Sequence, residues 1–313
     1  YILGHKKPDT DSIMSAISLS YLKNQWGKNT VAKTIGSINK ETKFALKYFN
    51  IPEPGYLNDV KLQIKDINYH KNFYIKETDS IYNGYKSMLG MSLTGLPVVK
   101  DNGKLIGIVT IKDLSHIIIN EKADYLYTSY NNILDVLKAE ELLKFDDEIY
   151  GKLLVASYRS TTFMETVKLK EDTILIVGDR HSIIEYAVKS KVKLIILSGD
   201  AQIKEEHLKI AEENKVNIIR TKYSSYHITR LIVLANYIKI MIKSYNPIKF
   251  EYTDFVDNFI DINNKFKHTN YPIVDRKNKC LGVLKVTDLS DKHPKKVILV
   301  DHNEKMQSVE GLE

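Results

Sequence analysis

The sequence contains a single cysteine and no long apolar segment. One cysteine, Cys280, excludes an internal disulfide and fits a reducing cytosol. No apolar run approaches the roughly 20 residues that cross a bilayer, so membrane insertion is not expected. The chain starts without Met and without a basic and then apolar leader, which we interpret as a trimmed start. Because Cys280 lies in an apolar strand-like run, we expect it to be a buried structural thiol.

A concentrated block of basic residues is also missing. The 313 residues carry a formal net charge of +7, but the lysines are scattered, so no nucleic-acid surface is predicted. A basic balance suits anionic small ligands such as nucleotides, although dispersed solvated lysines explain it equally well. The length is sufficient for two or three domains with a sizeable core.

Strand and helix patterns alternate near the start of the chain. Residues 1–3 and 31–35 are strand-like, while residues 13–21 and 41–49 place apolar side chains at helical spacing. Strand–helix–strand–helix order indicates a parallel sheet with helices packed on it. The sequence therefore predicts an α/β fold.

A loop with metal-ligating residue types follows the first strand and contains His5, Asp9 and Asp11. Residues 296–300 form another predicted strand, which ends at Asp301. Three carboxylates at one sheet edge would raise each other's pKa unless a cation lies among them. Imidazole and carboxylate together suit Mn²⁺, Co²⁺ or Fe²⁺, and a carboxylate from the second strand could bridge two metal ions. The alternative is that Asp9 and Asp11 serve as helix-cap and turn residues and His5 as an ordinary loop histidine.

Two segments of the chain repeat one another. Residues 96–109 and 271–284 each consist of two β-branched strands joined by a polar turn. An aspartate that opens a helix follows each segment, Asp113 in the first copy and Asp288 in the second. Both segments resemble the cystathionine-β-synthase (CBS) motif, which works in pairs.

A third unit lies between the two copies, at about residues 123–245. It contains several apolar strand runs, and the sequences Gly178-Asp179-Arg180 and Ser198-Gly199-Asp200 follow two of them. This unit resembles the DRTGG domain found in some CBS-containing proteins. The second loop departs from the Thr-Gly-Gly of that family.

Three further motifs resemble one enzyme family. Gly4-His5-x-x-Pro8-Asp9-x-Asp11-Ser12 is similar to the first motif of DHH phosphoesterases. Gly36-x-x-Asn39-x-Glu41-Thr42-x-Phe44-x-Leu46 and Asp301-His302-Asn303-Glu304-x-x-Gln307-Ser308 are similar to family II inorganic pyrophosphatases. The CBS and DRTGG units match the regulated subgroup of that family.

The resemblance implies a parallel-sheet DHH domain that is interrupted by a CBS pair and an α/β DRTGG domain. The implied bounds are 1–65 for the first part of the DHH domain, 66–122 for the first CBS motif, 123–245 for the DRTGG domain, 246–293 for the second CBS motif and 294–313 for the resumed, truncated DHH domain.

The resemblance also implies a catalytic centre. His5 and Asp9 would bind one metal ion, Asp11 the other, and Asp301 would bridge them. The two ions would be Mn²⁺ or Co²⁺, with Mg²⁺ able to accompany the substrate, and a hydroxide between them would attack pyrophosphate and release two phosphates. The Asp-His-His motif and the phosphate-clamping lobe of the family are absent from the sequence, so we expect this polypeptide alone not to hydrolyse pyrophosphate.

The CBS resemblance implies nucleotide sites. Asp113 and Asp288 occupy the ribose-binding position, Thr110 the preceding hydroxyl position, and Lys285 its equivalent, where it would contact phosphate. Lys100 is a further candidate for an adenine or phosphate contact. The implied regulators are AMP, ADP, ATP or diadenosine polyphosphates, and CBS pairing implies a homodimer. The alternative is that Asp113 and Asp288 are simply helix N-caps.

Two other functions remain open. A DHH phosphoesterase acting on short RNA or cyclic dinucleotides is disfavoured by the motif at Asp301 and by the lack of a basic-aromatic surface. A nucleotide sensor with a vestigial metal loop is disfavoured because His5, Asp9 and Asp11 are all present. The favoured prediction is a cytoplasmic inorganic pyrophosphatase regulated by adenine nucleotides.

Overall fold

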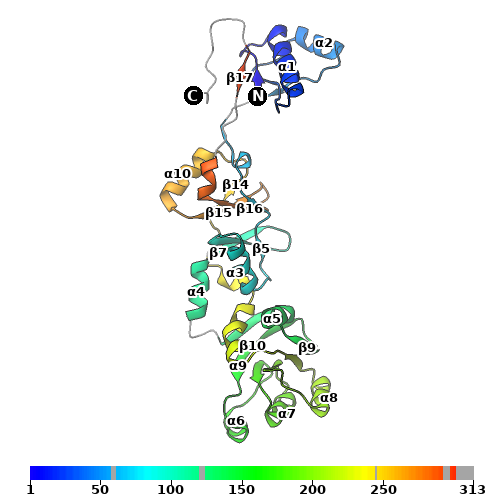
Figure 1. The fold of residues 1–313 in the computed structure, drawn as a ribbon, viewed down its shortest axis with the longest axis vertical. Coiled ribbons are helices and arrows are strands. Elements are labelled where there is room, and N and C mark those ends of the chain that lie inside the picture. Colours follow the sequence, from blue (N-terminus) through cyan, green and yellow to red (C-terminus); the bar gives the residue numbers. More distant parts are fainter. Residues whose placement is uncertain (58–60, 120–123, 244, 292–296, 301–313) are drawn as a thin grey trace. The chain divides into compact units, whose positions relative to one another are not determined.

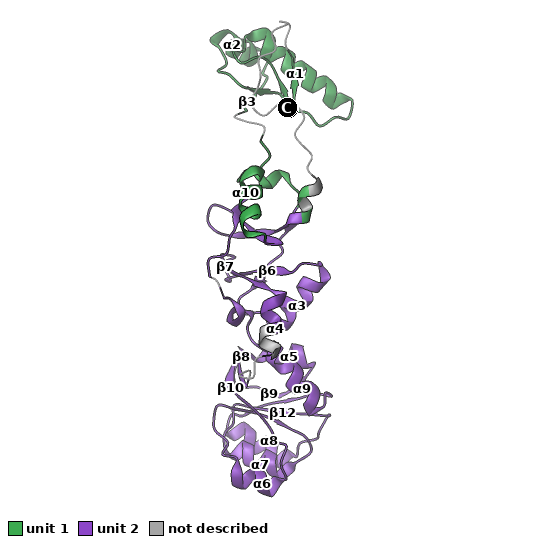
Figure 2. Cartoon of the chain, turned by 90° about the vertical axis from the view of Figure 1, so that its left-hand side faces the viewer, with its two compact units in different colours: residues 1–68, 252–267, 287–313 green, residues 69–251, 268–286 purple. Residues whose placement is uncertain are grey.

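The computed structural model describes residues 1–57, 61–119, 124–243, 245–291 and 297–300 (Figure 1). The chain forms two compact units (Figure 2). The first comprises Tyr1–Asn68, Tyr252–Lys267 and Thr287–Glu313, and the second comprises Tyr69–Glu251 and His268–Val286. Among the residues described, no helix combines the length and the apolar character that crossing a bilayer requires.

The first unit contains short parallel strands and helices. Its elements are β1 (Ile2–Leu3), α1 (Thr10–Gln25), β2 (Lys33–Thr34), α2 (Lys40–Tyr48), β3 (Gly55–Tyr56), the 3₁₀ helix η1 (Ile64–Asp66), α10 (Val256–Phe266) and β17 (Ile298–Leu299). β1 pairs in parallel with β17, and β2 pairs in parallel with β3. Ile2 also forms a parallel bridge with Ala32. These pairings are the alternating parallel arrangement that the sequence predicts.

Side-chain caps fix where the first two helices begin. Asp9 accepts a hydrogen bond from the backbone N–H of Ser12 at 2.9 Å, and Asn39 accepts one from Thr42 at 2.7 Å. Each bond satisfies a backbone donor that the first turn of a helix leaves unpaired. The caps therefore place the N-termini of α1 and α2 at the ends of the short loops that follow β1 and β2.

The second unit contains two copies of one strand pattern. Its elements outside the central sheet are β4 (His70–Lys71), β5 (Ile75–Lys76), α3 (Ile81–Gly90), β6 (Gly95–Val99), β7 (Leu105–Thr110), α4 (Ile111–Ile119), η3 (Ile238–Met241), β14 (Phe250–Glu251), β15 (Asn270–Val274) and β16 (Cys280–Lys285), while η4 (Val286–Asp291) starts at its boundary. β5 runs parallel to β6, which forms a hairpin with β7. β14, β15 and β16 repeat this order and these directions.

The remaining elements of the second unit build a six-stranded sheet in the order β8-β10-β11-β12-β13-β9. They are β8 (Tyr125–Ser129), α5 (Tyr130–Leu137), β9 (Glu140–Leu143), β10 (Glu148–Val155), α6 (Ser160–Thr166), β11 (Thr173–Val177), α7 (His181–Lys189), β12 (Leu194–Leu197), α8 (Glu205–Glu213), β13 (Asn217–Arg220), α9 (Ser225–Leu231) and η2 (Ile232–Ala235). The four inner strands are parallel, and the edge strands β8 and β9 are antiparallel.

Helices cover both faces of this sheet (Figure 1). The helices α6, α7 and α8 contribute to one buried apolar cluster, and α5, α9 and η2 contribute to another. All residues of β11 and β12 are buried. A strand that is covered on both faces carries a continuous apolar run rather than an alternating one, which explains the uniform sequences of these two strands.

Candidate functional site

The carboxylate of Asp113 is held at the start of α4. Its Oδ2 accepts hydrogen bonds from the backbone N–H of Thr110 at 2.9 Å and from the Thr110 hydroxyl at 2.7 Å. Its Oδ1 lies 3.0 Å from Nζ of Lys243. Partial burial acts to raise the pKa of Asp113, but the hydrogen bonds from Thr110 and Lys243 outweigh it, so the pKa lies below its usual value. Asp113 is therefore an oriented, ionised acceptor.

This geometry differs from the N-cap alternative, because Asp113 is the third residue of α4 and not the residue before it. Its side chain reaches back to the backbone N–H of Thr110, the residue before the helix, as the third residue of a capping box does. An ionised carboxylate has about four lone-pair sites, and three of them have partners here. The remaining site, and the one that Lys243 uses, can accept hydroxyl groups such as those of a ribose.

Thr110 and Lys285 occupy equivalent positions in the two hairpins. Thr110 lies opposite Gly95 at the end of the hairpin β6–β7, and Lys285 lies opposite Asn270 at the same end of the hairpin β15–β16. The Lys285 ammonium group donates to the carbonyl oxygen of Ser92 at 3.4 Å, so the second hairpin contacts the segment that leads from α3 into β6 at this end.

A polar cluster that the sequence did not predict joins the same ends of the hairpins. The hydroxyl oxygens of Thr94 and Thr269 are 2.7 Å apart, and Asn270 donates to Thr94 at 2.6 Å and to Thr269 at 2.9 Å. Within the described part of the chain, the buried Oδ1 of Asn270 has no hydrogen-bond partner. A buried acceptor left unpaired costs about 1–3 kcal/mol, which a donor from a ligand or a water would remove.

The two other predicted nucleotide-site residues are Lys100 and Asp288. Lys100 lies in the turn of the hairpin β6–β7, where its N–H donates to the carbonyl of Lys104 at 2.9 Å. Five strand residues separate it from the end that carries Thr110, a length of about 16 Å. The structure therefore does not bring Lys100 to Asp113. Asp288 lies in η4, and its side chain lies outside the described part of the chain.

The predicted metal loop follows β1. Nε2 of His5 lies 3.5 Å from Oδ1 of Asp9, close enough for the two atoms to share one ion. Asp11 is in the first turn of α1, where Oδ1 accepts from the Ser15 hydroxyl at 3.4 Å. Asp301 lies outside the described residues. The backbone N–H of Val300, the residue before it, donates to the carbonyl of Leu3 at 2.8 Å, so the strands β1 and β17 end side by side.

A second loop presses against the metal loop. A Cβ atom on Gly36 would lie 2.2 Å from the carbonyl oxygen of Lys6 and 2.5 Å from Cδ of Pro8. The hydroxyl oxygens of Thr10 and Thr42, at the starts of α1 and α2, are 3.0 Å apart. This close approach requires glycine at position 36, and it packs together the loops that follow β1 and β2.

The metal-binding prediction fits the described residues in part. His5 and Asp9 come together, and an imidazole with a carboxylate is a donor set that suits Mn²⁺ or Co²⁺. No group of three His, Cys, Asp or Glu side chains converges among the residues described. The described part of the loop therefore supplies two adjacent candidate ligands.

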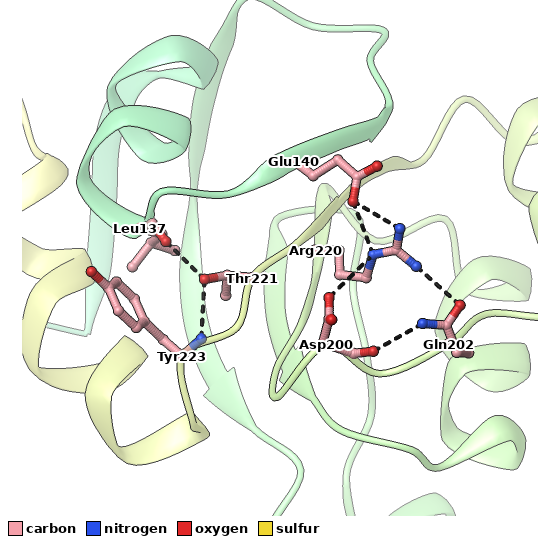
Figure 3. A network of polar contacts seen from close by, with 7 residues as sticks. All are labelled: Leu137, Glu140, Asp200, Gln202, Arg220, Thr221 and Tyr223. Atoms are coloured by element: carbon pink, nitrogen blue, oxygen red, sulfur yellow. Dashed lines mark hydrogen bonds and ion pairs between the residues drawn. The ribbon is translucent and has the colours of Figure 1, made fainter.

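The loops that follow β12 and β13 bond to each other (Figure 3). Arg220 donates to Glu140 at 2.7 Å and to Gln202 at 3.1 Å, and it lies 3.8 Å from Asp200. The N–H of Asp200 donates to the carbonyl oxygen of Thr221 at 3.0 Å. These bonds tie the edge strand β9 to the two loops, so the polar groups of this network act as structural links.

Comparisons with known proteins identify the domains. Residues 64–120 match the CBS domain family, and residues 132–235 match the DRTGG domain family. The whole chain is 30% identical to a cobalt-dependent inorganic pyrophosphatase of Clostridium perfringens and 27% identical to a probable manganese-dependent inorganic pyrophosphatase of Thermotoga maritima. The chain spans 58% of the length of each of these relatives. A stretch of 60 residues is 55% identical to a manganese-dependent inorganic pyrophosphatase of Methanothrix thermoacetophila, covering 19% of each chain.

A solved structure agrees with these matches. The CBS and DRTGG domains of the regulatory region of the Clostridium perfringens pyrophosphatase, complexed with the activator diadenosine tetraphosphate, match 72% of this chain and all of that chain. The TM-score is 0.64 and the sequence identity is 25%. The predicted α/β fold with CBS and DRTGG units is thereby confirmed, whereas the assignment of the terminal segments to a DHH domain stays a prediction. The chain contains CBS and DRTGG domains and is similar to inorganic pyrophosphatases, of which that of Clostridium perfringens has both domains in its regulatory region.

Proposed function

We propose that this chain is the nucleotide-responsive part of a Mn²⁺- or Co²⁺-dependent inorganic pyrophosphatase, together with the first portion of its catalytic domain. AMP, ADP, ATP or a diadenosine polyphosphate binds the paired CBS motifs and alters pyrophosphate hydrolysis in the whole protein. Only a ligand with different affinities for two conformations can produce such control. A cytoplasmic location and a homodimer formed through the CBS motifs belong to the same proposal.

The observation that carries the nucleotide site is the geometry of Asp113. Thr110 orients the carboxylate, and the side chain remains 15% exposed, so it is within reach of a ligand. Vicinal hydroxyl groups of a ribose are donors that suit an ionised carboxylate. Lys285 supplies a cation at the equivalent position of the second hairpin, and the orphaned oxygen of Asn270 supports a polar ligand nearby.

Calorimetric titration tests nucleotide binding directly. AMP, ADP, ATP and diadenosine tetraphosphate are titrated separately into the chain, with GMP as the matched control for the base. We expect at least one adenine nucleotide to bind at micromolar concentrations and GMP to bind more weakly. If none of the four adenine ligands gives a binding isotherm, the nucleotide proposal is wrong.

The catalytic proposal rests on His5, Asp9 and Asp11. His5 and Asp9 would hold one ion, and Asp11 and Asp301 would complete a two-ion site with it. The pair would supply an activated hydroxide and neutralise charge on the phosphates. The residues of this chain position the ligands: Asp9 is fixed by its bond to the Ser12 N–H, and Gly36 lets the second loop close on the first.

Titration with Mn²⁺, followed by the electron paramagnetic resonance signal of the free ion, separates this proposal from a nucleotide sensor with a vestigial loop. We expect the wild-type chain to bind Mn²⁺ and His5→Ala to weaken binding about tenfold, or 1.4 kcal/mol. His227→Ala, a histidine of α9 in the second unit, serves as the control. A wild-type chain that binds no Mn²⁺ would favour the sensor.

A further inference from the structure

Lys243 forms an ion pair with Asp113, the carboxylate that would bind the ribose of a nucleotide. Its ammonium nitrogen lies 3.0 Å from Oδ1 of Asp113, while Oδ2 is taken by Thr110. The Lys243 side chain is 63% exposed and that of Asp113 is 15% exposed. Lysine can therefore leave the carboxylate without moving any buried group, whereas Asp113 and Thr110 are fixed.

The protein holds Lys243 at this place through a segment that is distant in sequence. Ile238, Met241 and Ile242 pack into the apolar cluster of the first CBS unit, together with Ile81 and Leu96. The N–H of Ile238 donates to the carbonyl of Asp79 at 2.8 Å. The chain that leaves the DRTGG domain thus forms part of the core of the first CBS unit. Lys243 directly follows the buried Ile242 and extends to Asp113 in the candidate nucleotide site.

A ligand that binds Oδ1 of Asp113 must displace the ammonium group of Lys243. The free energy of this displacement differs between charged and uncharged ligands. A neutral nucleoside that takes Oδ1 with its ribose removes a charge-assisted hydrogen bond from Lys243 and offers the ammonium no anion in return. A nucleoside phosphate offers it one. The flexible four-carbon stem of lysine allows the ammonium group to move from the carboxylate to a nearby phosphate.

We propose that Lys243 makes the site at Asp113 selective for nucleoside phosphates over nucleosides. In the free chain it neutralises and covers the Asp113 carboxylate. In the complex it leaves Oδ1 to the ribose and pairs with the phosphate. This inference rests on the proposed function, because it concerns the same nucleotide site, and it assigns to Lys243 a role in specificity.

The test compares AMP with adenosine. Calorimetry gives the ratio of the two dissociation constants for the wild-type chain and for Lys243→Met. We expect Lys243→Met to bind AMP more weakly and adenosine more tightly, so that the preference for AMP falls by about tenfold. Lys243→Arg, which keeps the charge, should retain most of that preference.

A matched control lies on the same segment. Lys239, four residues earlier, lies over the rings of Tyr127 and Tyr237 at 4.8 and 4.9 Å, so Lys239→Met removes the same charge without touching Asp113. The ratio of the dissociation constants of AMP and adenosine for Lys239→Met should equal that for the wild type. An unchanged ratio in Lys243→Met, with AMP still bound by the wild type, overturns the role of Lys243 alone. A wild-type chain that binds no adenine nucleotide overturns the proposed function and this inference with it.

Discussion

The hairpins β6–β7 and β15–β16 pair their strands in the same register but carry different residues at their ends. Pro97 lies opposite Ile108 in the first, and Pro272 lies opposite Val283 in the second. Both pairings shift register at the last residue pair, which identifies the two copies as one structural repeat. The core of the repeat is thus conserved within the chain while the residues at its ends differ.

Two differences separate the copies. The second hairpin has an extra partner, because β4 pairs with β16, whereas the sheet of the first ends at β7. At the equivalent end positions, the first copy has Thr110, which orients Asp113, and the second has Lys285. These equivalent positions therefore carry a hydroxyl group in the first copy and a cation in the second. We infer that a nucleotide would meet unlike groups at the two copies.

The largest effect is expected where β4 meets the second hairpin. Gly282 has φ +148°, and a Cβ atom there would lie 2.0 Å from the carbonyl oxygen of His70. Gly282→Ala combines a strained backbone with a backbone clash and should lower the free energy of unfolding by at least about 3 kcal/mol. Urea denaturation followed by circular dichroism measures the change.

Gly90→Ala is the matched control for this substitution. Gly90 is the last residue of α3, and a Cβ atom there would meet nothing within 4 Å. The control should unfold within about 1 kcal/mol of the wild type. If Gly282→Ala is equally harmless, the backbone of β4 does not approach β16 as described.

A smaller effect is expected at the cationic end of the second hairpin. Lys285→Met should weaken binding of ATP more than binding of AMP, because a longer phosphate chain carries more negative charge. One partly screened charge pair contributes up to about 1 kcal/mol, so the loss for ATP is about fivefold by calorimetry. Lys277→Met, in the exposed turn at the other end of this hairpin, should change neither affinity. Equal losses for AMP and ATP would argue against a phosphate contact at Lys285.

A further prediction concerns the apolar contact between the two copies. Cys280 occupies the position of Leu105, and both pack with Val99 and Val274. Burial raises the pKa of the Cys280 thiol to about 11, against a weaker lowering by its hydrogen bond to Gly282. At pH 8 the thiol stays protonated in the folded chain.

Alkylation by iodoacetamide measures this directly. The native chain should react on the order of a hundredfold more slowly than the urea-unfolded chain at pH 8, since only the thiolate reacts. Titration of this thiol should not change the free energy of unfolding below the ordinary pKa of cysteine, because the thiol is then mostly protonated in both the folded and the unfolded chain. Rapid labelling of the native chain would place Cys280 outside the core.

Local patterns predicted most of the fold. The apolar runs of β10, β11 and β12, the repeated hairpins and the first two helices all follow from periodicity and turn residues. The capping alternative is seen for Asp9, whereas Asp113 lies inside the first turn of α4 and is not its N-cap. These features depend on residues a few positions apart, which a sequence displays directly.

Contacts between distant segments could not be predicted in this way. Lys243 follows the DRTGG domain in the sequence, yet it pairs with Asp113, which precedes that domain. Thr94, before the first hairpin, contacts Thr269 and Asn270 at the start of the second. Such contacts depend on how distant segments of one unit fold back on one another, and no local pattern records this. Lys100 illustrates the converse, because it is near Thr110 in sequence but lies at the opposite end of the hairpin.

Calorimetric titration of AMP into Asp113→Ala tests the nucleotide site most directly. The substitution removes the ribose acceptor, and AMP affinity should fall at least about tenfold, since hydrogen bonds to a charged group contribute about 1.5–3 kcal/mol each. Asp101→Ala, in the exposed turn of the same hairpin, should bind AMP like the wild type. Circular dichroism establishes that both variants remain folded. A folded Asp113→Ala chain with unchanged AMP affinity would contradict the assignment of the ribose to Asp113.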